Sequence, residues 1–253
     1  MKITFLGTGT SQGVPVVACD CSVCKSTDEK DKRLRSSVLI EMEEKIIVID
    51  AGPDFRQQLL REAIMQLDGI ILTHGHKDHI GGLDDVRAFN YLQKKAIDIY
   101  ARKEVHDQIR IEFEYAFSEA RYPGVPEFHL KVIENKPFMM EGIEVIPIEA
   151  LHFKLPVFGY RIREFAYLTD LSSITEKEKE KLLGVKVVVL PALRKKPHYS
   201  HMNLVQALEL IAEIKPERAY LTHISHLMGL HTEVEKELPE HVRLAYDGLK
   251  IEL

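Results

Sequence analysis

One short segment, residues 73–79, gathers more metal-binding side chains than packing or solubility requires. It reads Thr-His-Gly-His-Lys-Asp-His, so three imidazoles and one carboxylate lie within six positions. Side chains two apart in an extended segment point to the same side, so His74 and His76 can bind one metal ion together. The turn that follows lets Asp78 and His79 face a second ion. Nitrogen and oxygen donors of this kind suit Zn, Mn or Fe.

The three cysteines form a second cluster. They lie within Cys19-Asp20-Cys21-Ser22-Val23-Cys24, a C-x-C-x-x-C pattern. In a reducing compartment an odd, clustered set favours metal over disulfides. Structural zinc is closed and four-coordinate, so three neighbouring thiolates need a fourth ligand from elsewhere. We predict a structural zinc loop at residues 19–24, with buried or free thiols as the alternative.

Strands must position these groups. The apolar run Gly69–Leu72 reads as a short buried strand that ends at the histidine segment. Loops at strand ends are where sites are normally built on a rigid scaffold. Three further candidates follow predicted strands: His152 in a loop, Asp170 at a strand end and His223 at a strand end.

The remaining pattern alternates strands and helices. Residues 35–40 and 45–49 read as a hairpin that ends in Asp50-Ala51-Gly52, and residues 203–214 read as an amphipathic helix. Lys2–Leu6 reads as an edge or hairpin strand, and residues 243–251 as a closing hairpin. Two similar halves of strands and helices predict a four-layer α/β/β/α sandwich, with residues 1–253 forming a single domain.

Residues 103–126 form a charged stretch that is rich in aromatic residues and closed by Pro123-Gly124-Val125-Pro126. We predict a helical insertion here. Its aromatic side chains are expected to be mainly packing residues. The same stretch is where a lid, or the contact of a homodimer, is expected.

Composition limits the class of protein. At 253 residues, 45% hydrophobic and 29% charged, the chain has the make-up of a soluble globular protein. Met1–Leu6 lacks a basic-plus-apolar signal, and no apolar run approaches the ~20 residues of a bilayer span, so we expect a cytoplasmic protein without membrane contact. The net charge of −5 argues against a long nucleic-acid partner and is compatible with a small phosphate ester.

The pattern H-x-H-x-D-H, followed by a distant His, Asp and His, resembles the metallo-β-lactamase superfamily, as does Asp50-Ala51-Gly52. The resemblance runs from Ile3 to the end of the chain. It implies one ion held by His74, His76 and His152. It implies a second ion held by Asp78, His79 and His223, with Asp170 bridging the two. It also implies that Asp50 accepts a hydrogen bond from a ligand histidine and fixes its orientation.

Further motifs narrow the resemblance. Gly7-Thr8-Gly9, Gln12-Gly13-Val14-Pro15, the cysteine segment, residues 222–226 and Asp247-Gly248 together look like the phosphoribosyl cyclic phosphate phosphodiesterases of phosphonate utilisation. In that family three thiolates and a histidine close a structural zinc site, which maps here to Cys19, Cys21, Cys24 and His226. The implied activity is hydrolysis of small or cyclic phosphate esters with two Mn or Zn ions. Two such ions suit hydrolysis because they hold a hydroxide nucleophile and neutralise the phosphate.

Proton transfer needs further residues. Departure of an alkoxide is easier when a neighbouring group gives it a proton. In related phosphodiesterases and tRNA-processing nucleases, a histidine that binds no metal lies just before a helix, which implies His201, with His198 as the alternative. Asp78 is placed to accept a proton from the nucleophilic water while it is bound to metal.

Three other functions share parts of the pattern. A tRNA 3′-processing endoribonuclease has the histidine cluster but normally lacks the cysteines and carries a basic arm, whereas the 103–126 stretch is acidic. A thioesterase of the glyoxalase II kind would need a carboxy-terminal helical part. A non-catalytic, zinc-stapled binding protein would have no reason to keep all seven metal ligands.

Overall fold

The structure is a computed structural model that describes residues 1–119 and 122–253. One set of strands comprises β1 (Lys2–Gly7), β2 (Ser37–Met42), β3 (Lys45–Ile49), β4 (Gly69–Ile71), β5 (Ile97–Ala101), β6 (Phe128–Val132) and β15 (Lys250–Glu252). The other comprises β7 (Phe138–Met140), β8 (Ile143–His152), β9 (Leu155–Ile162), β10 (Phe165–Tyr167), β11 (Ser173–Ile174), β12 (Val187–Pro191), β13 (Arg218–Thr222) and β14 (Val242–Leu244).

Short helices connect the strands. The α-helices are α1 (Phe55–Arg61), α2 (Lys77–Ile80), α3 (Arg87–Gln93), α4 (Lys103–Glu112), α5 (Glu114–Phe117), α6 (Glu176–Lys179), α7 (Leu204–Ile214) and α8 (His231–Val234). The 3-10 turns are η1 (Glu29–Asp31), η2 (Leu83–Val86), η3 (Glu180–Leu182) and η4 (Glu235–Glu237). Along the described residues, no helix is both long and apolar enough to cross a membrane.

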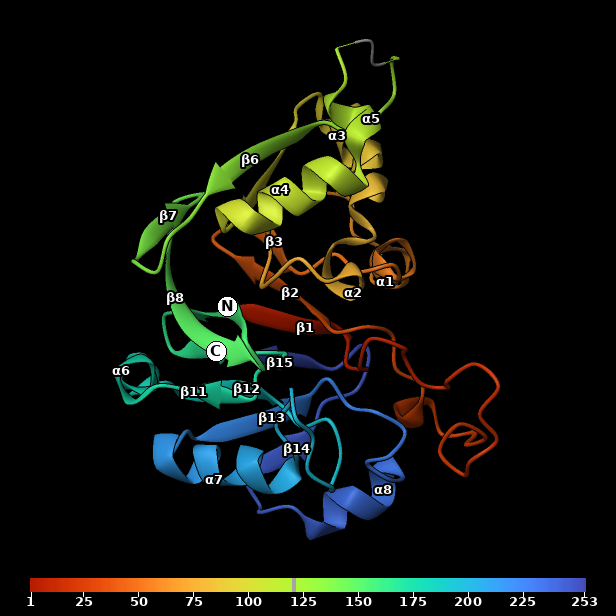
Figure 1. Cartoon of the computed structure of the whole chain (residues 1–253), viewed down its shortest axis with the longest axis vertical. Coiled ribbons are helices and arrows are strands. Elements are labelled where there is room, and N and C mark those ends of the chain that lie inside the picture. Colours follow the sequence, from red (N-terminus) through yellow and green to blue (C-terminus); the bar gives the residue numbers. More distant parts are fainter. Residues whose placement is uncertain (120–121) are drawn as a thin grey trace.

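The strands form two sheets that face each other, with helices on the outer faces (Figure 1). The order is β15-β1-β2-β3-β4-β5-β6 in the first sheet and β11-β8-β9-β10-β12-β13-β14 in the second, where β7 pairs with β8. Helices α1, α3 and α4 cover the first sheet, and α7 covers the second. The predicted four-layer sandwich, the metallo-β-lactamase fold, is confirmed.

Alternating side chains build the layers. In β3, Ile47 and Ile49 face the core between the sheets, whereas Val48 packs toward the helices on the outer face. Strand β12 repeats this pattern, with alternate residues between the sheets and beneath α7. Because both faces of these strands are buried, the strands read as continuous apolar runs.

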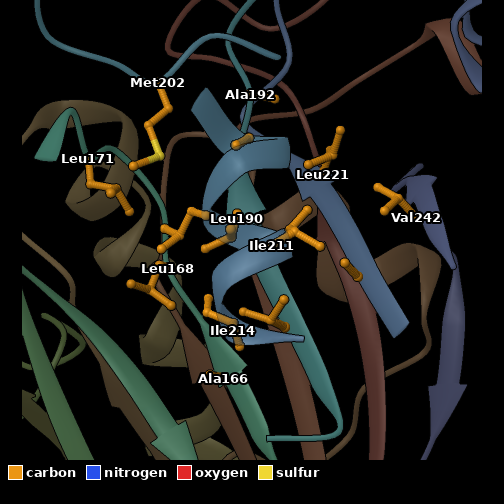
Figure 2. Packing of buried hydrophobic residues seen from close by; sticks show 14 of the residues in the cluster. Ala166, Leu168, Leu171, Leu190, Ala192, Met202, Ile211, Ile214, Leu221 and Val242 are labelled. Atoms are coloured by element: carbon orange, nitrogen blue, oxygen red, sulfur yellow. The ribbon is translucent and has the colours of Figure 1, made fainter. Parts of the chain in front are cut away.

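Helix α7 shows why its sequence forms a helix. Asn203 caps it: its side chain accepts from the Gln206 backbone N–H, and the Gln206 side chain accepts from the Asn203 N–H. Leu204, Ala207, Ile211 and Ile214 are buried on one face. Figure 2 shows Ile211 and Ile214 over the strands that carry Leu190 and Leu221. The amphipathic helix predicted over 203–214 is confirmed.

Two strand predictions are wrong at the sheet edges. The tail is not a hairpin, because β14 pairs with β13 in the second sheet and β15 pairs with β1 in the first. The Asp247 carboxylate, which accepts from the Leu34 backbone N–H and the Thr8 hydroxyl, holds the chain where it crosses between the sheets. As a result β1 lies inside its sheet, between β15 and β2, and is neither an edge strand nor part of a hairpin.

The helical prediction for residues 103–126 holds only in part. Helices α4 and α5 cover 103–117 with a break at Phe113, whose φ of −119° is not helical. Residues 118–119 and 122–126 contain no helix, and residues 120–121 lie outside the described part of the chain.

Candidate active site

Asp50 and Thr73 meet at one edge of the first sheet. Strands β3 and β4 are parallel neighbours, so the residues that follow them emerge side by side. The fully buried Asp50 carboxylate accepts from the Thr73 backbone N–H at 2.8 Å and from its hydroxyl at 2.9 Å. It also lies 2.7 Å from Nδ1 of His79. The contact predicted between Asp50 and a histidine is therefore present.

His74 and His76 follow β4. The Thr73 hydroxyl gives its proton to Asp50, so its oxygen is left to accept from Nδ1–H of His74 at 3.0 Å. Nε2 of His74 then lies 3.0 Å from Nδ1 of His76. Two unprotonated ring nitrogens at this separation are suitably placed to share one cation.

Asp78 and His79 lie in the single-turn helix α2, which His76 precedes as its N-terminal cap residue. Nδ1–H of His79 donates to Asp50, which turns Nε2 inward, 3.2 Å from Oδ2 of Asp78. This Nε2 is buried and has no hydrogen-bond partner among the described residues.

His152 is the last residue of β8, not a loop residue as its sequence predicts. Strand β8 pairs with β9 as far as His152 opposite Leu155, so the strand is longer than the local pattern indicates. Nδ1–H of His152 donates to the Ser200 carbonyl oxygen at 2.7 Å, which leaves Nε2 free to face the centre.

Asp170 and His223 follow strands β10 and β13 of the second sheet. Asp170 lies between two histidines, with Oδ2 3.1 Å from Nε2 of His79 and Oδ1 3.1 Å from Nε2 of His223. Ser36 donates its hydroxyl proton to the Gly9 carbonyl oxygen, so its Oγ accepts from Nδ1–H of His223 at 3.2 Å. The carboxylate predicted as a bridge thus contacts histidines from both sheets.

The predicted ligands therefore converge around Asp170. The donors form three groups, and within each group the ligand atoms lie within 4.8 Å of one another. The groups are His74, His79 and Asp170; His152, Asp170 and His201; and Asp78, Asp170 and His223. His76 joins them through His74. Which donors share an ion stays a prediction.

The donor set fits divalent metal ions. In His74, His79, His152 and His223 the outer ring nitrogen is held by an oxygen acceptor, which turns the lone pair of the inner nitrogen toward the centre. A ring nitrogen that faces a carboxylate oxygen at 3.1–3.2 Å needs a proton or a metal cation between the two atoms. Imidazole nitrogens with carboxylates are ligands that zinc and manganese accept.

Electrostatics supports the same interpretation. Burial lowers the pKa of His74 and of His223, which favours the neutral form of each ring that binds a metal. Burial opposes the charge of Asp170, but His223 and His79 outweigh it and hold the pKa of this carboxyl well below its usual range.

His201, rather than its alternative His198, lies beside Asp170. Nδ1 of His201 is 3.6 Å from Oδ1 of Asp170, and its ring stacks on His223 with centroids 5.0 Å apart. This nitrogen is buried without a hydrogen-bond partner in the described structure. Nδ1 of His198 instead accepts from the Ser200 backbone N–H. Burial, then His223, lowers the pKa of His201 to about 3.

The residue after His201 anchors the loop. The Met202 backbone N–H donates to the Leu171 carbonyl oxygen at 2.8 Å, and the Met202 carbonyl oxygen accepts from the Leu193 N–H at 3.0 Å. Figure 2 shows the Met202 side chain beside Leu171 in the core beneath α7. Because Leu171 directly follows Asp170, one buried contact fixes both His201 and Asp170.

Several supporting residues were missed by the sequence analysis. Thr73 positions His74, Ser36 positions His223, and the Ser200 carbonyl oxygen positions His152. The threonine had a signal, because an apolar residue and a threonine precede three of the predicted ligands: Leu72-Thr73-His74, Leu168-Thr169-Asp170 and Leu221-Thr222-His223. The serine contacts had none.

The four residues predicted for structural zinc also meet. The Sγ atoms of Cys19, Cys21 and Cys24 lie 3.2, 3.4 and 3.5 Å from Nδ1 of His226. Tetrahedral zinc, with Zn–S of about 2.3 Å and Zn–N of about 2.0 Å, separates sulfur and nitrogen by about 3.5 Å. A backbone N–H from Cys24, then His226, lowers the pKa of Cys21 to about 6. The donors fit a closed zinc site.

A cleft of about 380 Å³ opens beside the histidine centre. One wall comes from helix α4 and the arginine before it, and the opposite wall from the start of β9. Its lining residues are His74, Gly75, His76, Arg102, Glu104, Val105, Gln108, Leu155 and Pro156. Phe113, at the break between α4 and α5, and Phe117 of α5 pack against Phe128 of β6, as predicted for packing residues.

Comparison with solved structures identifies a close relative. A diphosphatase of the PhnP family superposes with a TM-score of 0.93 and is 39% identical, covering 100% of this chain and 97% of that one. The short form of human tRNase Z has a TM-score of 0.72 at 22% identity, covering 100% of this chain and 99% of that one, which shows a shared fold.

Curated relatives are longer. An octanoyltransferase of Porphyromonas gingivalis is 42% identical over 253 residues, which are 99% of this chain and 51% of that protein. A ribonuclease Z of Nostoc punctiforme is 30% identical over 193 residues, covering 73% of this chain and 52% of that protein. The chain thus spans about half the length of the curated relatives it matches.

A protein-family model described as the beta-lactamase superfamily domain matches residues 45–224. These residues include most of the donors around Asp170. The fold, the converging donors and this match agree. The chain belongs to the beta-lactamase superfamily and is a metal-dependent hydrolase with the metallo-β-lactamase fold.

Proposed function

We propose that this protein is a phosphodiesterase with two active-site metal ions that hydrolyses small or cyclic phosphate esters. The observation that carries the proposal is the position of Asp170. It contacts histidines of two donor groups and also lies 3.6 Å from the unpartnered Nδ1 of His201. The similarity to a PhnP-family diphosphatase over the whole chain supports phosphate chemistry.

The proposed metals are two Mn or Zn ions in the active site and one structural zinc. The active-site ligands are His74, His76, His152, Asp78, His79, His223 and the shared Asp170; the structural ligands are Cys19, Cys21, Cys24 and His226. Divalent ions bound at the centre would activate water and neutralise charge on the phosphoryl group. Asp50 and Ser36 orient His79 and His223 toward them.

Two residues of the chain would move protons. Asp78, beside His79, accepts the proton of the attacking water. His201 donates a proton to the leaving oxygen. Its ring is neutral when buried among the other histidines, and an anionic phosphate bound beside it supplies the charge that favours the protonated form.

The proposal also covers organisation and partners. Residues 1–253 act as a single domain, the substrate is a small phosphate ester, and neither a membrane nor a long nucleic acid is a partner. We also propose that the chain can form a homodimer, with residues 103–126 at the contact. The cleft beside His74 and His76 has the volume of small-ligand sites, which span roughly 300–1,000 Å³.

tRNA 3′-end processing is the second candidate, because ribonuclease Z relatives are 28–30% identical over 64–73% of the chain. Helices α4 and α5 carry Glu104, Asp107, Glu112 and Glu114, which suit a polyanion poorly. The octanoyltransferase relative suggests no separate activity for this chain, since about half of that protein lies outside the matched region.

A substrate panel tests the proposal. Purified protein is assayed on bis-p-nitrophenyl phosphate, a 2′,3′-cyclic nucleotide, a diphosphate diester, a thioester and a precursor tRNA, and its metals are measured alongside. We expect turnover of the small phosphate esters and about three metal ions per chain. Faster cleavage of precursor tRNA or of the thioester would replace the proposal, and no turnover of any substrate by metal-loaded protein would favour a binding protein.

A further inference from the structure

We propose that Phe153 and Tyr199 form a stacking site for a nucleobase of the substrate, at the rim of the centre. This inference rests on the proposed function, and it names the substrate class as small nucleotide esters. We call these two residues and Lys154, whose ammonium group lies over the Phe153 ring, the aromatic rim.

The two rings come from different loops and meet outside the centre. Phe153 is in the turn between β8 and β9, directly after His152, and Tyr199 is in the loop between β12 and α7, two residues before His201. Their centroids lie 5.8 Å apart, edge to face, yet Phe153 is 53% exposed and Tyr199 75% exposed. The pair therefore presents open aromatic surface to solvent beside two proposed site residues.

The backbone of Phe153 is a second, independent observation. Its φ of +56° lies in the left-handed region, which glycine and asparagine enter readily and bulky residues rarely enter. A glycine here would form the turn with less strain. Strained residues of this kind gather at functional sites, where the side chain has a task that outweighs the strain.

A row of rings connects the rim to the centre. Tyr199 stacks on His198 with centroids 4.5 Å apart and planes 27° apart, and the His198 centroid is 5.3 Å from that of His201. His201 in turn faces Asp170. Two ring contacts separate the rim from the proposed proton donor. A base on the rim therefore leaves its sugar and phosphate free to extend toward the centre.

The charge of the rim suits a nucleotide. Nζ of Lys154 lies 5.4 Å from the centroid of the Phe153 ring. Within the described residues, Lys154 forms no ion pair with a carboxylate within 4 Å, so its ammonium group is available to an anion. Aromatic rings beside cations are the usual platform for bases of single nucleotides. The acidic residues of α4 and the net charge of −5 favour a small ester over a long RNA.

Two esters with the same scissile bond test the site: thymidine 5′-(p-nitrophenyl phosphate) and its counterpart without the base. Stacking of one base should favour the first by about 5- to 100-fold in kcat/KM. Phe153→Gly and Tyr199→Ala should each reduce this preference, and Tyr199→Phe should keep it. Tyr91→Ala is the matched control, since Tyr91 is 78% exposed on α3 with Lys94 over its ring at 4.1 Å; the preference should stay unchanged.

Binding of AMP and of ribose 5-phosphate by wild type and variants separates this inference from the proposed function. We expect AMP to bind more tightly, with the difference reduced in Phe153→Gly and Tyr199→Ala. If neither these two esters nor the phosphate esters of the substrate panel are hydrolysed, the proposed function fails. The preference for AMP over ribose 5-phosphate then tests the aromatic rim by itself.

Three results would overturn the rim: equal kcat/KM for both esters, equal losses on both esters in the variants, or a lower melting temperature of Phe153→Gly, which would give the ring a structural role. If Phe153 and Tyr199 increased kcat/KM only on RNA with a 3′ trailer, the assignment of the aromatic rim to small esters would be wrong.

Discussion

The two clusters of metal-binding side chains are built in opposite ways. The cysteine cluster takes three donors from six consecutive residues and is only partly buried; apart from Cys24, its donors are accessible to solvent. Around Asp170, the donors come from strand ends of both sheets, and four histidine rings are each held by an oxygen behind them. Close spacing in the sequence is enough to bring together the ligands of a structural metal site. A reactive centre also requires the fold to orient each ligand.

The two clusters nevertheless share one segment. His223 belongs to the centre and His226 to the cysteine cluster, three residues apart. The segment that follows the cysteine loop is also held in place, because Asp31 of η1 accepts from the His231 backbone N–H at 2.8 Å. A substitution in one cluster should therefore also affect the other cluster to some extent. The following variants measure the size of this effect.

Asp170→Ala should have the largest effect. It removes a carboxylate that contacts histidines of both sheets, so metal affinity should fall at both ion positions. Turnover should drop by more than the roughly 10- to 100-fold typical of changes behind the ligands. Metal analysis and steady-state kinetics check this. Asp247→Asn, at a carboxylate outside the centre whose side chain is 10% exposed, should keep both ions. Full phosphodiesterase activity in Asp170→Ala would refute the two-ion centre.

His201→Ala should rank second. It removes the proposed proton donor, so the rate on an ester with an alkoxide leaving group should fall by about 100- to 10,000-fold. The loss should be much smaller with p-nitrophenolate, which leaves without a proton. The His201 nitrogen also lies within 4.8 Å of donors on His152 and Asp170, so metal content must be measured. Loss of an ion would make His201 a ligand, and equal losses on both esters would assign it to phosphate binding.

Cys21→Ser should affect stability more than chemistry. It replaces one thiolate of a closed site, so the protein should lose one zinc and melt at a lower temperature, while molecules that stay folded keep the active-site ions. Differential scanning calorimetry with metal analysis checks this. Ser22→Ala, at an exposed neighbour that offers no donor, is the control. Unchanged zinc content and melting temperature in Cys21→Ser would disprove the structural site.

The smallest effect concerns pH. Nδ1 of His231 accepts from Arg33 at 3.1 Å, and burial, then Arg33, lowers the pKa of His231 to about 4. A histidine with a depressed folded-state pKa stabilises the fold above pH 6.5, and this stability is lost as the pH falls from 6.5 toward 4. The loss should reach about 3 kcal/mol.

His231→Asn keeps an acceptor near the Nδ1 position but does not titrate, so it should lose less stability over this pH range than wild type. Chemical denaturation at pH 7 and pH 4.5 gives the difference, to which the other titrating groups contribute equally in both proteins. His241→Asn, at an exposed histidine, should follow wild type. Parallel curves for wild type and His231→Asn would show that Arg33 does not control this ring.

Much of the centre could be predicted from spacing and strand ends. Dense motifs revealed both clusters, and apolar runs located the strands before Asp170 and His223. His152 follows a predicted strand but has no motif around it, and His226 has neither signal, so the assignment of both as ligands depended on the family resemblance. The Ser200 carbonyl oxygen behind His152 could not be predicted, because every residue has a backbone carbonyl and only the tertiary structure selects one.

The errors in the fold have a common physical origin. The tail reads as a hairpin because two short apolar runs flank Asp247-Gly248, but strand pairing is decided by partners far away in sequence, here β13 and β1. The end of β8 was missed because Glu149–His152 lacks a strict alternation, and its pairing with β9 extends the strand. Local pattern predicts that a strand exists better than it predicts where the strand ends or pairs.

Three residues of the centre, Asp50, Asp170 and His223, share one backbone feature with a consequence for protein engineering. All three have positive φ values, of 65°, 51° and 54°, and lie one to three residues beyond the ends of buried strands. Such conformations destabilise a fold by about 1–3 kcal/mol each. Directed evolution that selects for heat resistance alone should therefore accumulate glycine or asparagine at these positions and discard the catalyst while improving the scaffold.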